Sequence, residues 1–327
     1  MIDQLFRARK TLALIEAADD LKLLEELARG PRRTTELAEL TRIAPEVLRD
    51  LLELLAWSGV LSEDGERWTL GQEWAPLVGS GGRDGVLPLL RIERWAAEDH
   101  LNARGIVAAL RGHRCPPEIP RRHVGDLAEA MARGARATAP HVARLPEWRD
   151  RRHFADLAGG SGGYAITLCR LHGDLRATVY DRPEMLAHAE KNVAEAGLAD
   201  RIDLVPWNLT ADEVPAGHDS VVLSHVLHLL DADQRAGLLR RVRSALGEGD
   251  LVVVHDFLGD QAEQGPEQAA LVVDWLANGS GFLLDREGLA AELANAALTA
   301  ERIVPIKSAN TTLMIARCST TSDWLFS

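Results

Sequence analysis

From residue 153 onward the sequence alternates short apolar runs with segments of helical periodicity, and this alternation limits the fold more than any other feature. The apolar runs occupy residues 153–158, 175–180, 202–205, 220–223 and 251–254. The helical segments between them occupy residues 164–171, 183–196 and 232–246. Repeated strand–helix–strand units of this kind predict an α/β domain, in which helices cover a parallel sheet.

The end of the chain departs from this pattern. Residues 302–306 and 311–315 are both apolar, but only a few residues separate them. A parallel crossover needs about a dozen residues or more, so the two runs are predicted to pair as an antiparallel hairpin. Residues 151–327 are therefore predicted to form a Rossmann-like parallel sheet with an antiparallel terminal hairpin.

The N-terminal part of the chain predicts helices followed by one small hairpin. The helical segments occupy residues 21–27, 35–40 and 45–58. Pro45 stands at the first position of its helix, which favours proline. Two short strands flank the Asp64-Gly65 dipeptide, a strong hairpin signal. Three helices and a hairpin predict a mostly α winged-helix domain, to which we assign residues 1–95.

Charge argues against binding of nucleic acid by this domain. The whole chain has a net charge of -12. Acidic residues outnumber Arg42 and Arg49 in the recognition-helix candidate and its approach, residues 36–58. DNA phosphates repel such a surface, so a DNA-reading regulator is the weaker alternative. We interpret residues 1–95 as a dimerisation and lid module, and residues 96–150 as a helical linker and substrate-lid region.

The cysteines and the apolar runs indicate the compartment. Cys115, Cys169 and Cys318 are isolated, which favours neither a disulfide framework nor a structural zinc site. The N-terminus lacks the layout of a signal peptide, and no apolar run approaches transmembrane length. The sequence predicts a cytoplasmic protein without a membrane partner.

The first predicted strand of the sheet runs into a glycine-rich turn, Asp156-Leu-Ala-Gly-Gly-Ser-Gly-Gly163. Glycine permits a tight turn and lets a ligand approach the backbone. Asp156, Gly159, Gly160 and Ser161 are therefore candidate ligand-binding residues. Taken alone, the turn fits any nucleoside or dinucleotide.

Asp181 follows the second predicted strand, about 20 residues beyond the glycines, the offset of a carboxylate that binds ribose hydroxyls. Asp181 could also cap the helix that starts near Pro183, since aspartate is a favoured cap. The turn and the carboxylate together favour an adenosine-containing ligand. They fit a nicotinamide-dependent dehydrogenase too, but the terminal hairpin argues against that alternative.

Two further strand ends carry polar residues. Asn208 could hydrogen-bond an adenine edge while Trp207 or Leu209 packs on its face, although Asn208 could equally be a turn residue. Ser224 ends the fourth strand, at the edge of the sheet where ligands bind. His228 follows closely, and a neutral imidazole there could take a proton from a substrate hydroxyl.

Together these segments resemble the bacterial and plant O-methyltransferases that carry an N-terminal winged-helix dimerisation domain. The resemblance covers nearly the whole chain. Asp156–Gly163 is similar to the family's Asp-x-Gly-Gly-Gly-x-Gly turn, and Val226-Leu-His-Leu-Leu-Asp231 resembles its Val-Leu-His-Asp-Trp segment. The other matching segments are residues 15–61, 67–70, 180–183 and 254–257.

The resemblance implies a homodimer and S-adenosylmethionine as cofactor. Gly160 and its neighbours would hold the methionine part, Asp181 the ribose, and Asn208 would face the adenine. Ser224 would contact the cofactor near its sulfonium. The implied reaction is methyl transfer to a small aromatic or polyketide metabolite, most readily to a hydroxyl oxygen.

The resemblance also assigns the chemistry. His228 would be the general base, and Asp256 would orient it. We expect the substrate pocket near Met131, Trp275 and Phe282. His225, His228 and Asp256 could alternatively bind iron or zinc, because imidazole and carboxylate ligands suit these metals. We interpret the group as a base with its orienting acid and predict no metal.

The sequence departs from the family pattern in places. Ala158 stands at the first glycine of the turn, which we expect it to tolerate in extended backbone. Asn208 replaces an aspartate, and Leu229-Leu230 replaces Asp-Trp after the histidine. Two alternatives therefore accompany O-methylation. One is a family member that binds the cofactor but catalyses decarboxylation, hydroxylation or a pericyclic reaction, and the other is methyl transfer to carbon or nitrogen.

Overall fold

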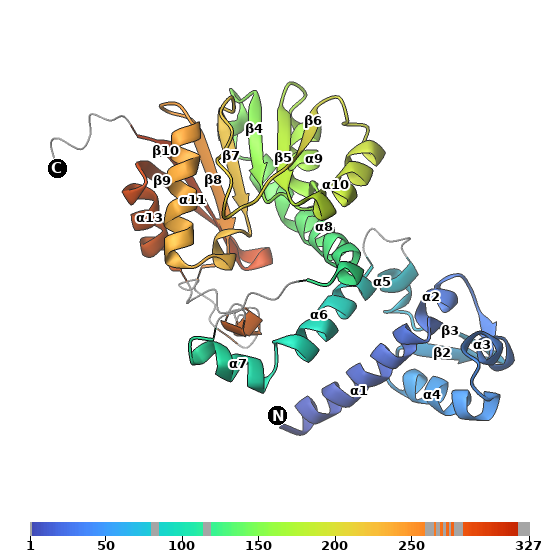
Figure 1. The fold of residues 1–327 in the computed structure, drawn as a ribbon. Coiled ribbons are helices and arrows are strands. Elements are labelled where there is room, and N and C mark those ends of the chain that lie inside the picture. Colours follow the sequence, from blue (N-terminus) through green and yellow to red (C-terminus); the bar gives the residue numbers. More distant parts are fainter. Residues whose placement is uncertain are drawn as a thin grey trace. The chain divides into compact units, whose positions relative to one another are not determined.

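The structure, a computed structural model, divides into two compact units, Met1–Trp95 and Ala96–Ser327. Figure 1 colours the chain from its N-terminus to its C-terminus. Whether residues 96–150 act as a separate lid region stays a prediction. The described residues are 2–79, 85–113, 119–258, 265, 269–270, 273–274, 276–277 and 284–319.

The smaller unit contains the predicted helices and hairpin, and it also contains a long first helix, two helical segments after the hairpin and one short strand. Its strands form a three-stranded antiparallel sheet of order β1-β3-β2. Trp68 is buried on this sheet and donates its indole N–H to the Thr34 hydroxyl at 2.9 Å. The elements are α1 (Ile2–Asp20), α2 (Leu23–Ala28), β1 (Arg32–Arg33), α3 (Thr34–Thr41), α4 (Pro45–Trp57), β2 (Leu61–Asp64), β3 (Arg67–Leu70), α5 (Ala75–Gly79) and the first part of α6 (Leu87–Asp99).

The larger unit is built on a seven-stranded sheet of order β6-β5-β4-β7-β8-β10-β9. Neighbours from β6 to β8 pair in parallel, whereas β10 pairs antiparallel with both β8 and β9. The predicted parallel sheet with an antiparallel terminal hairpin is confirmed. The strands are β4 (His153–Leu157), β5 (Arg176–Asp181), β6 (Ile202–Pro206), β7 (Ser220–Ser224), β8 (Leu251–Asp256), β9 (Leu298–Ile306) and β10 (Thr311–Cys318).

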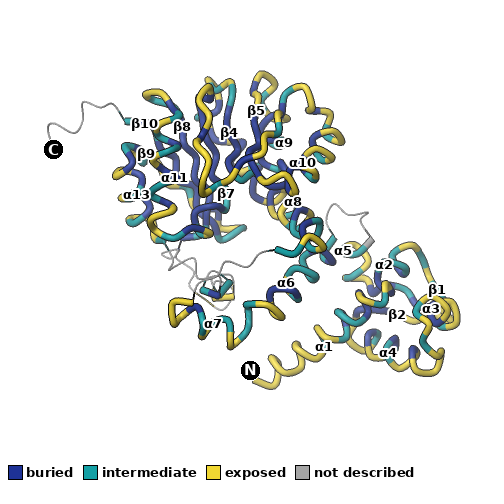
Figure 2. The backbone as a smooth tube through the Cα atoms, in the orientation of Figure 1, coloured by how far each residue is buried: buried dark blue, intermediate teal, exposed yellow. Residues whose placement is uncertain are grey.

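Helices cover both faces of this sheet, because alternate residues of the strands point to opposite faces. Phe154, Val222 and Val253 pack with α8 and α9 on one face. Ala155 and Val254 pack with α11 and α13 on the other face. Figure 2 shows the strands buried between these layers. The helices are α7 (Ala103–Leu110), α8 (Arg121–Ala143), α9 (Gly163–Leu171), α10 (Pro183–Glu195), α11 (Ala232–Ala245) and α13 (Arg286–Asn295), with short 3-10 turns η1 (Pro146–Trp148), η2 (Leu227–Leu229) and η3 (Lys307–Ala309).

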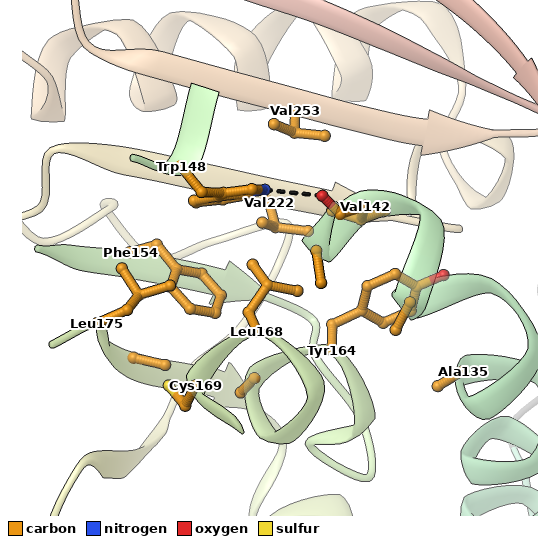
Figure 3. Close-up of a cluster of buried hydrophobic side chains, with 14 of the residues drawn as sticks. Ala135, Val142, Trp148, Phe154, Tyr164, Leu168, Cys169, Leu175, Val222 and Val253 are labelled. Carbon is orange, nitrogen blue, oxygen red and sulfur yellow. Dashed lines mark hydrogen bonds between the residues drawn. The ribbon is translucent and has the colours of Figure 1, made fainter. Parts of the chain in front are cut away.

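Trp148 closes the first of these cores. Its ring packs against Phe154 with centroids 5.4 Å apart, and its indole N–H donates to the Val142 carbonyl at 2.8 Å (Figure 3). The bond joins Trp148 to the end of α8 and the ring contact joins it to Phe154 of β4, so the long helix is held against the sheet. Within the part of the chain that the structure describes, no helix could cross a membrane.

The strand order positions the site. From β4 the chain first adds β5 and β6 on one side, and later β7 and β8 on the other. Ligands of parallel sheets bind where the order reverses, outside the carboxyl ends of the strands. Every predicted strand-end residue lies at this edge.

Candidate active site

The glycine turn and the end of β5 are joined by a direct bond. Gly160 has a φ of 58°, a left-handed conformation that favours glycine. Its N–H donates to an Asp181 carboxylate oxygen at 2.7 Å. A Cβ atom at Gly160 would collide with the methyl group of Met131 on α8. The structure thus brings together three predicted residues: Gly160, Asp181 and Met131.

Asp181 is not the helix cap that the sequence offered as an alternative. The residue before α10 is Arg182, and its side chain makes no capping bond. The Asp181 carboxylate instead accepts hydrogen bonds from the N–H groups of Gly160 and Arg182, both at 2.7 Å. Burial raises the pKa of Asp181. The side chain is therefore held at the glycine turn.

Asp156 lies beneath the turn and is 1% exposed. Neither carboxyl oxygen has a hydrogen-bond partner among the described residues. Position 159 requires glycine, because a Cβ atom there would lie 2.6 Å from the carboxyl carbon of Asp156. Burial raises the pKa of Asp156 to about 7. A buried carboxyl group without a partner fits a ligand that supplies a donor or a positive charge.

Two neighbours complete the turn. Ser161 is buried, and its carbonyl accepts a hydrogen bond from the Asn192 side chain at 3.0 Å. Ala158 was expected in extended backbone, but that prediction is wrong, because its φ is 55°. The left-handed conformation strains any residue with a Cβ, so Ala158 follows the glycine's backbone path at a cost of about 1–2 kcal/mol.

The loop after β6 supports the turn interpretation of Asn208. Asn208 is exposed, and its side-chain oxygen accepts hydrogen bonds from the Thr210 N–H and hydroxyl, each at 3.0 Å. Trp207 is buried and donates its indole N–H to the Glu213 carbonyl, so it belongs to the core. Leu209 is half-buried and remains the candidate for packing on an adenine.

Arg241 on α11 fixes this loop, and sequence reasoning missed it. Its guanidinium donates to the Leu209 carbonyl at 2.7 Å and also to the Asp212 carbonyl. A third bond, from Nε to the Gly237 carbonyl, lies within α11 and fixes the guanidinium, and the two bonds from its rigid fork hold the loop backbone in place. No sequence signal marks Arg241, because Arg240 and Arg243 stand beside it on the same helix.

His228 and Asp256 form a close pair at the ends of β7 and β8. The His228 Nδ1 atom lies 2.7 Å from an Asp256 carboxylate oxygen. The second Asp256 oxygen accepts from the N–H groups of Leu227 and His228, at 3.0 and 3.3 Å. Burial favours a protonated carboxyl, but electrostatic attraction to the His228 and His225 rings and the hydrogen bonds from His228 and the Phe257 N–H outweigh it and lower the pKa of Asp256 to about 2.

This geometry gives His228 a defined tautomer. A charged Asp256 accepts the Nδ1 proton, so Nε2 is the basic nitrogen of the neutral ring. The carboxylate also stabilises the imidazolium that forms when Nε2 takes up a proton. The structure therefore brings His228 and Asp256 into direct contact, and their roles as base and orienting acid stay a prediction.

A buried network around His255 was not predicted. The His255 ring contacts the Tyr164 hydroxyl through Nδ1 and the Thr311 hydroxyl through Nε2, both at 2.8 Å. Tyr164 also bonds Thr138 on α8 at 2.6 Å, and Ser224 lies 3.4 Å from the His255 Nδ1 atom. A histidine directly after the apolar run of residues 251–254 was the available signal, because a polar residue in a buried strand needs partners.

Burial lowers the pKa of His255 to about 3, which makes stability depend on pH. Unfolded histidine has a pKa near 6.5, so between about pH 6.5 and 3 the unfolded chain binds a proton that the folded chain does not. We expect the contribution of His255 to be full above pH 6.5 and to be lost as the pH falls. The free energy of unfolding, measured with urea, rises with pH between pH 4 and 6. This rise should be smaller by about 1 kcal/mol per pH unit in His255→Gln than in the wild type. The exposed His113→Gln is the control, and equal slopes in all three proteins would contradict the prediction.

Of the three predicted substrate residues, the structure describes only Met131. Met131 is 38% exposed and lies at the glycine turn, as described above. Trp275 and Phe282 lie outside the described residues.

Comparisons with known proteins identify the family of this chain. A profile described as an O-methyltransferase domain matches residues 127–289. The 3-hydroxy-5-methyl-1-naphthoate 3-O-methyltransferase of Streptomyces sahachiroi is 30% identical over 267 residues, which cover 79% of this chain and 77% of the relative. This chain belongs to the S-adenosylmethionine-dependent O-methyltransferase family.

Two other similar proteins differ in the atom that they methylate. The N,N-dimethyltransferase OxyT of Streptomyces rimosus is 27% identical over 79% of this chain and 78% of its own. The solved structure of the mitomycin 7-O-methyltransferase MmcR has a TM-score of 0.83 at 23% identity and covers 97% of both chains. The second likeness establishes that the methyltransferase shares the fold of MmcR over nearly its whole length.

Proposed function

We propose that this methyltransferase binds S-adenosylmethionine at the glycine turn and methylates a hydroxyl oxygen of a small aromatic or polyketide metabolite, with His228 as the general base. The observation that carries the proposal is the 2.7 Å contact between His228 and a charged, buried Asp256. This pair lies at the same sheet edge as the turn. An amine substrate can react through its lone pair, whereas a phenol reacts far better once a base has taken its proton.

The residues at the turn suit the proposed cofactor. Asp156 would face the amino group of the methionine part, which supplies the donor that its buried oxygens lack. Asp181 would accept the ribose hydroxyls, and Leu209 would pack on the adenine beside Asn208. Ser161 and Ser224 would border the methionine part and the sulfur. When bound, the cofactor supplies an electrophilic methyl group on a positively charged sulfur.

The protein's own contribution is orientation and proton transfer. Positioning of two reactants supplies about 7–11 kcal/mol in favourable cases. His228 Nε2 would accept the hydroxyl proton, and Asp256 would balance the resulting positive charge. A positioned base typically contributes on the order of 10²–10⁴-fold. Met131 would line the substrate pocket, together with Trp275 and Phe282.

Nitrogen is the second candidate acceptor, because the relative from S. rimosus is an N,N-dimethyltransferase. The two candidates differ in their need for a base. With an amine substrate, loss of His228 should change kcat little, whereas with a phenol it should lower kcat strongly.

Transfer of a labelled methyl group tests the proposal. Purified protein is incubated with methyl-labelled S-adenosylmethionine and a panel of hydroxynaphthoates, other phenols and matched aromatic amines. We expect label to appear as a methyl ether of a phenol, with one S-adenosylhomocysteine formed per product. Cofactor binding without label transfer, together with decarboxylated or hydroxylated product, would identify a family member with different chemistry.

Arg241 gives a prediction about the cofactor. Without its bonds to the loop after β6, the backbone at Leu209 and Asp212 loses its anchor on α11. Arg241→Gln is expected to raise the Kd for S-adenosylhomocysteine about tenfold, since bonds to charged donors contribute about 1.5–3 kcal/mol and glutamine retains part of them. The kcat at saturating cofactor should change little. The neighbouring exposed Arg240→Gln is the control in calorimetry, and equal Kd values for both variants would contradict the prediction.

We infer further that the protein is a homodimer through its N-terminal unit. Helix α1 exposes a row of large apolar side chains, among them Leu5 and Phe6, which are 64% and 57% exposed. Monomeric proteins rarely leave such a row open to water. A second copy of the same unit is the occupant expected, because most soluble oligomers are symmetric homo-oligomers.

Charge on this row should split the dimer. The Leu5→Glu/Phe6→Glu double variant is expected to run as a monomer in light scattering at concentrations where the wild type is a dimer. Gln4→Glu adds charge to the same helix at an exposed polar position and should leave the dimer intact. A wild type that is monomeric, or a double variant that stays dimeric, would overturn the inference.

A further inference from the structure

His225 is a half-buried side chain that the proposed mechanism does not use. Its Nδ1 atom is buried and has no hydrogen-bond partner among the described residues. An unpaired buried nitrogen is rare and calls for an explanation such as a bound water or ion. Its ring is wedged between His255 and Phe257, with centroids 4.6 and 4.8 Å away. The ring is therefore fixed in place without a polar partner.

The backbone conformation at His225 is also unusual. Its φ is 55°, a left-handed conformation that is uncommon outside glycine. The chain holds this conformation by a 2.7 Å hydrogen bond from the His225 N–H to the His255 carbonyl. Residues held in such conformations cluster at ligand clamps and active sites. The imidazole lies beside His255 and Phe257, at the end of β8.

Two further ligand groups lie beside it. One nitrogen each of His225 and His228 and one carboxylate oxygen of Asp256 all lie within 4.8 Å of one another. Two imidazoles and one carboxylate form a donor set that suits zinc, iron or cobalt. Zinc–nitrogen bonds of about 2.0–2.1 Å would require these atoms to approach to roughly 3.3 Å, a movement that small rotations of the rings can supply.

We propose that His225, His228 and Asp256 form a binding site for a divalent transition-metal ion. The ion takes the place of the proton that His228 Nδ1 shares with Asp256, and that proton leaves to solvent. His225 supplies the third ligand, which completes the coordination of its unpaired nitrogen. Because Nε2 of a metal-bound His228 no longer has its orienting carboxylate, the ion inhibits proton transfer; this consequence rests on the proposed function, whereas the site itself does not.

Cobalt(II) tests the site without reference to activity, because its visible absorption reports coordination by protein ligands. Full-length protein is freed of metal with a chelator and titrated with Co²⁺. We expect saturable visible bands at one ion per chain, which Zn²⁺ abolishes by displacement. His225→Asn should weaken Co²⁺ binding by at least about tenfold, and asparagine tolerates the left-handed backbone, so the fold should persist. Circular dichroism and thermal melting check the fold.

The exposed His113→Asn is the matched control for adventitious binding to histidine, and it should titrate like the wild type. Absence of saturable bands in the wild type would overturn the proposal, as would an unchanged titration of His225→Asn. In a second arm, Zn²⁺ should inhibit methyl transfer and a chelator should restore it. If no methyl transfer occurs at all, the proposed function fails while the cobalt titration still decides the site.

Discussion

His228→Gln is expected to lower kcat for a phenolic substrate by roughly 10²–10⁴-fold, the usual contribution of a positioned general base. Glutamine can still bond Asp256 but cannot take up a proton. The Kd for S-adenosylhomocysteine should stay the same, because His228 lies outside the glycine turn. Single-turnover transfer of labelled methyl groups measures the first quantity and calorimetry the second.

Asp256→Asn should lower kcat through the same pair. An amide can offer its N–H to His228 and so favour the tautomer in which Nε2 carries the proton and cannot act as a base. His113→Gln controls for the loss of a histidine elsewhere. A rate for His228→Gln within a few-fold of the wild type would show that the enzyme works by positioning alone or that its acceptor needs no base.

Asp181→Asn is expected to raise the Kd for S-adenosylhomocysteine about a hundredfold. Two hydrogen bonds from ribose to a charged acceptor contribute about 1.5–3 kcal/mol each, and a loss near 3 kcal/mol corresponds to about two orders of magnitude. The amide would also set an N–H against the N–H of Gly160 or Arg182, which now donate to the carboxylate. Calorimetric titration measures the change.

Glu184→Gln is the matched control for Asp181→Asn, because Glu184 is an exposed acid three positions further along the chain. Its replacement removes the same charge from the first turn of α10 without touching Gly160. If both variants bound S-adenosylhomocysteine as tightly as the wild type, the ribose would have to lie elsewhere on the sheet edge.

The larger unit was predictable because its signals are periodic and local. Buried parallel strands are continuous apolar runs, and the five predicted runs became β4, β5, β6, β7 and β8. The short gap before residue 311 allowed no crossover, so the terminal hairpin followed from chain length alone. Helix α8 contains Gly125, Gly134 and Pro140, which lower its helix propensity. Packing against α9 and the Trp148 bond to Val142 stabilise it instead.

The site residues were predictable where strand ends carry them and not where tertiary contacts select them. Gly160, Asp181 and the His228–Asp256 pair follow from the carboxyl edge of a parallel sheet. Ala158 was misjudged because the turn imposes a left-handed conformation regardless of residue type. His255 and Arg241 act through partners far away in the chain, Thr311 and Asp212 among them. Such contacts leave no spacing pattern in the sequence.

The most direct test of the account is a crystal structure of the protein with S-adenosylhomocysteine and a phenol that the enzyme methylates, bound in its unmethylated form. The deciding measurement is the distance from His228 Nε2 to the hydroxyl oxygen that faces the cofactor sulfur. We predict a distance of about 2.6–3.2 Å, as general-base catalysis requires. A hydroxyl that faces the sulfur but lies beyond reach of His228, even through one water, would contradict the assignment of His228 as the base.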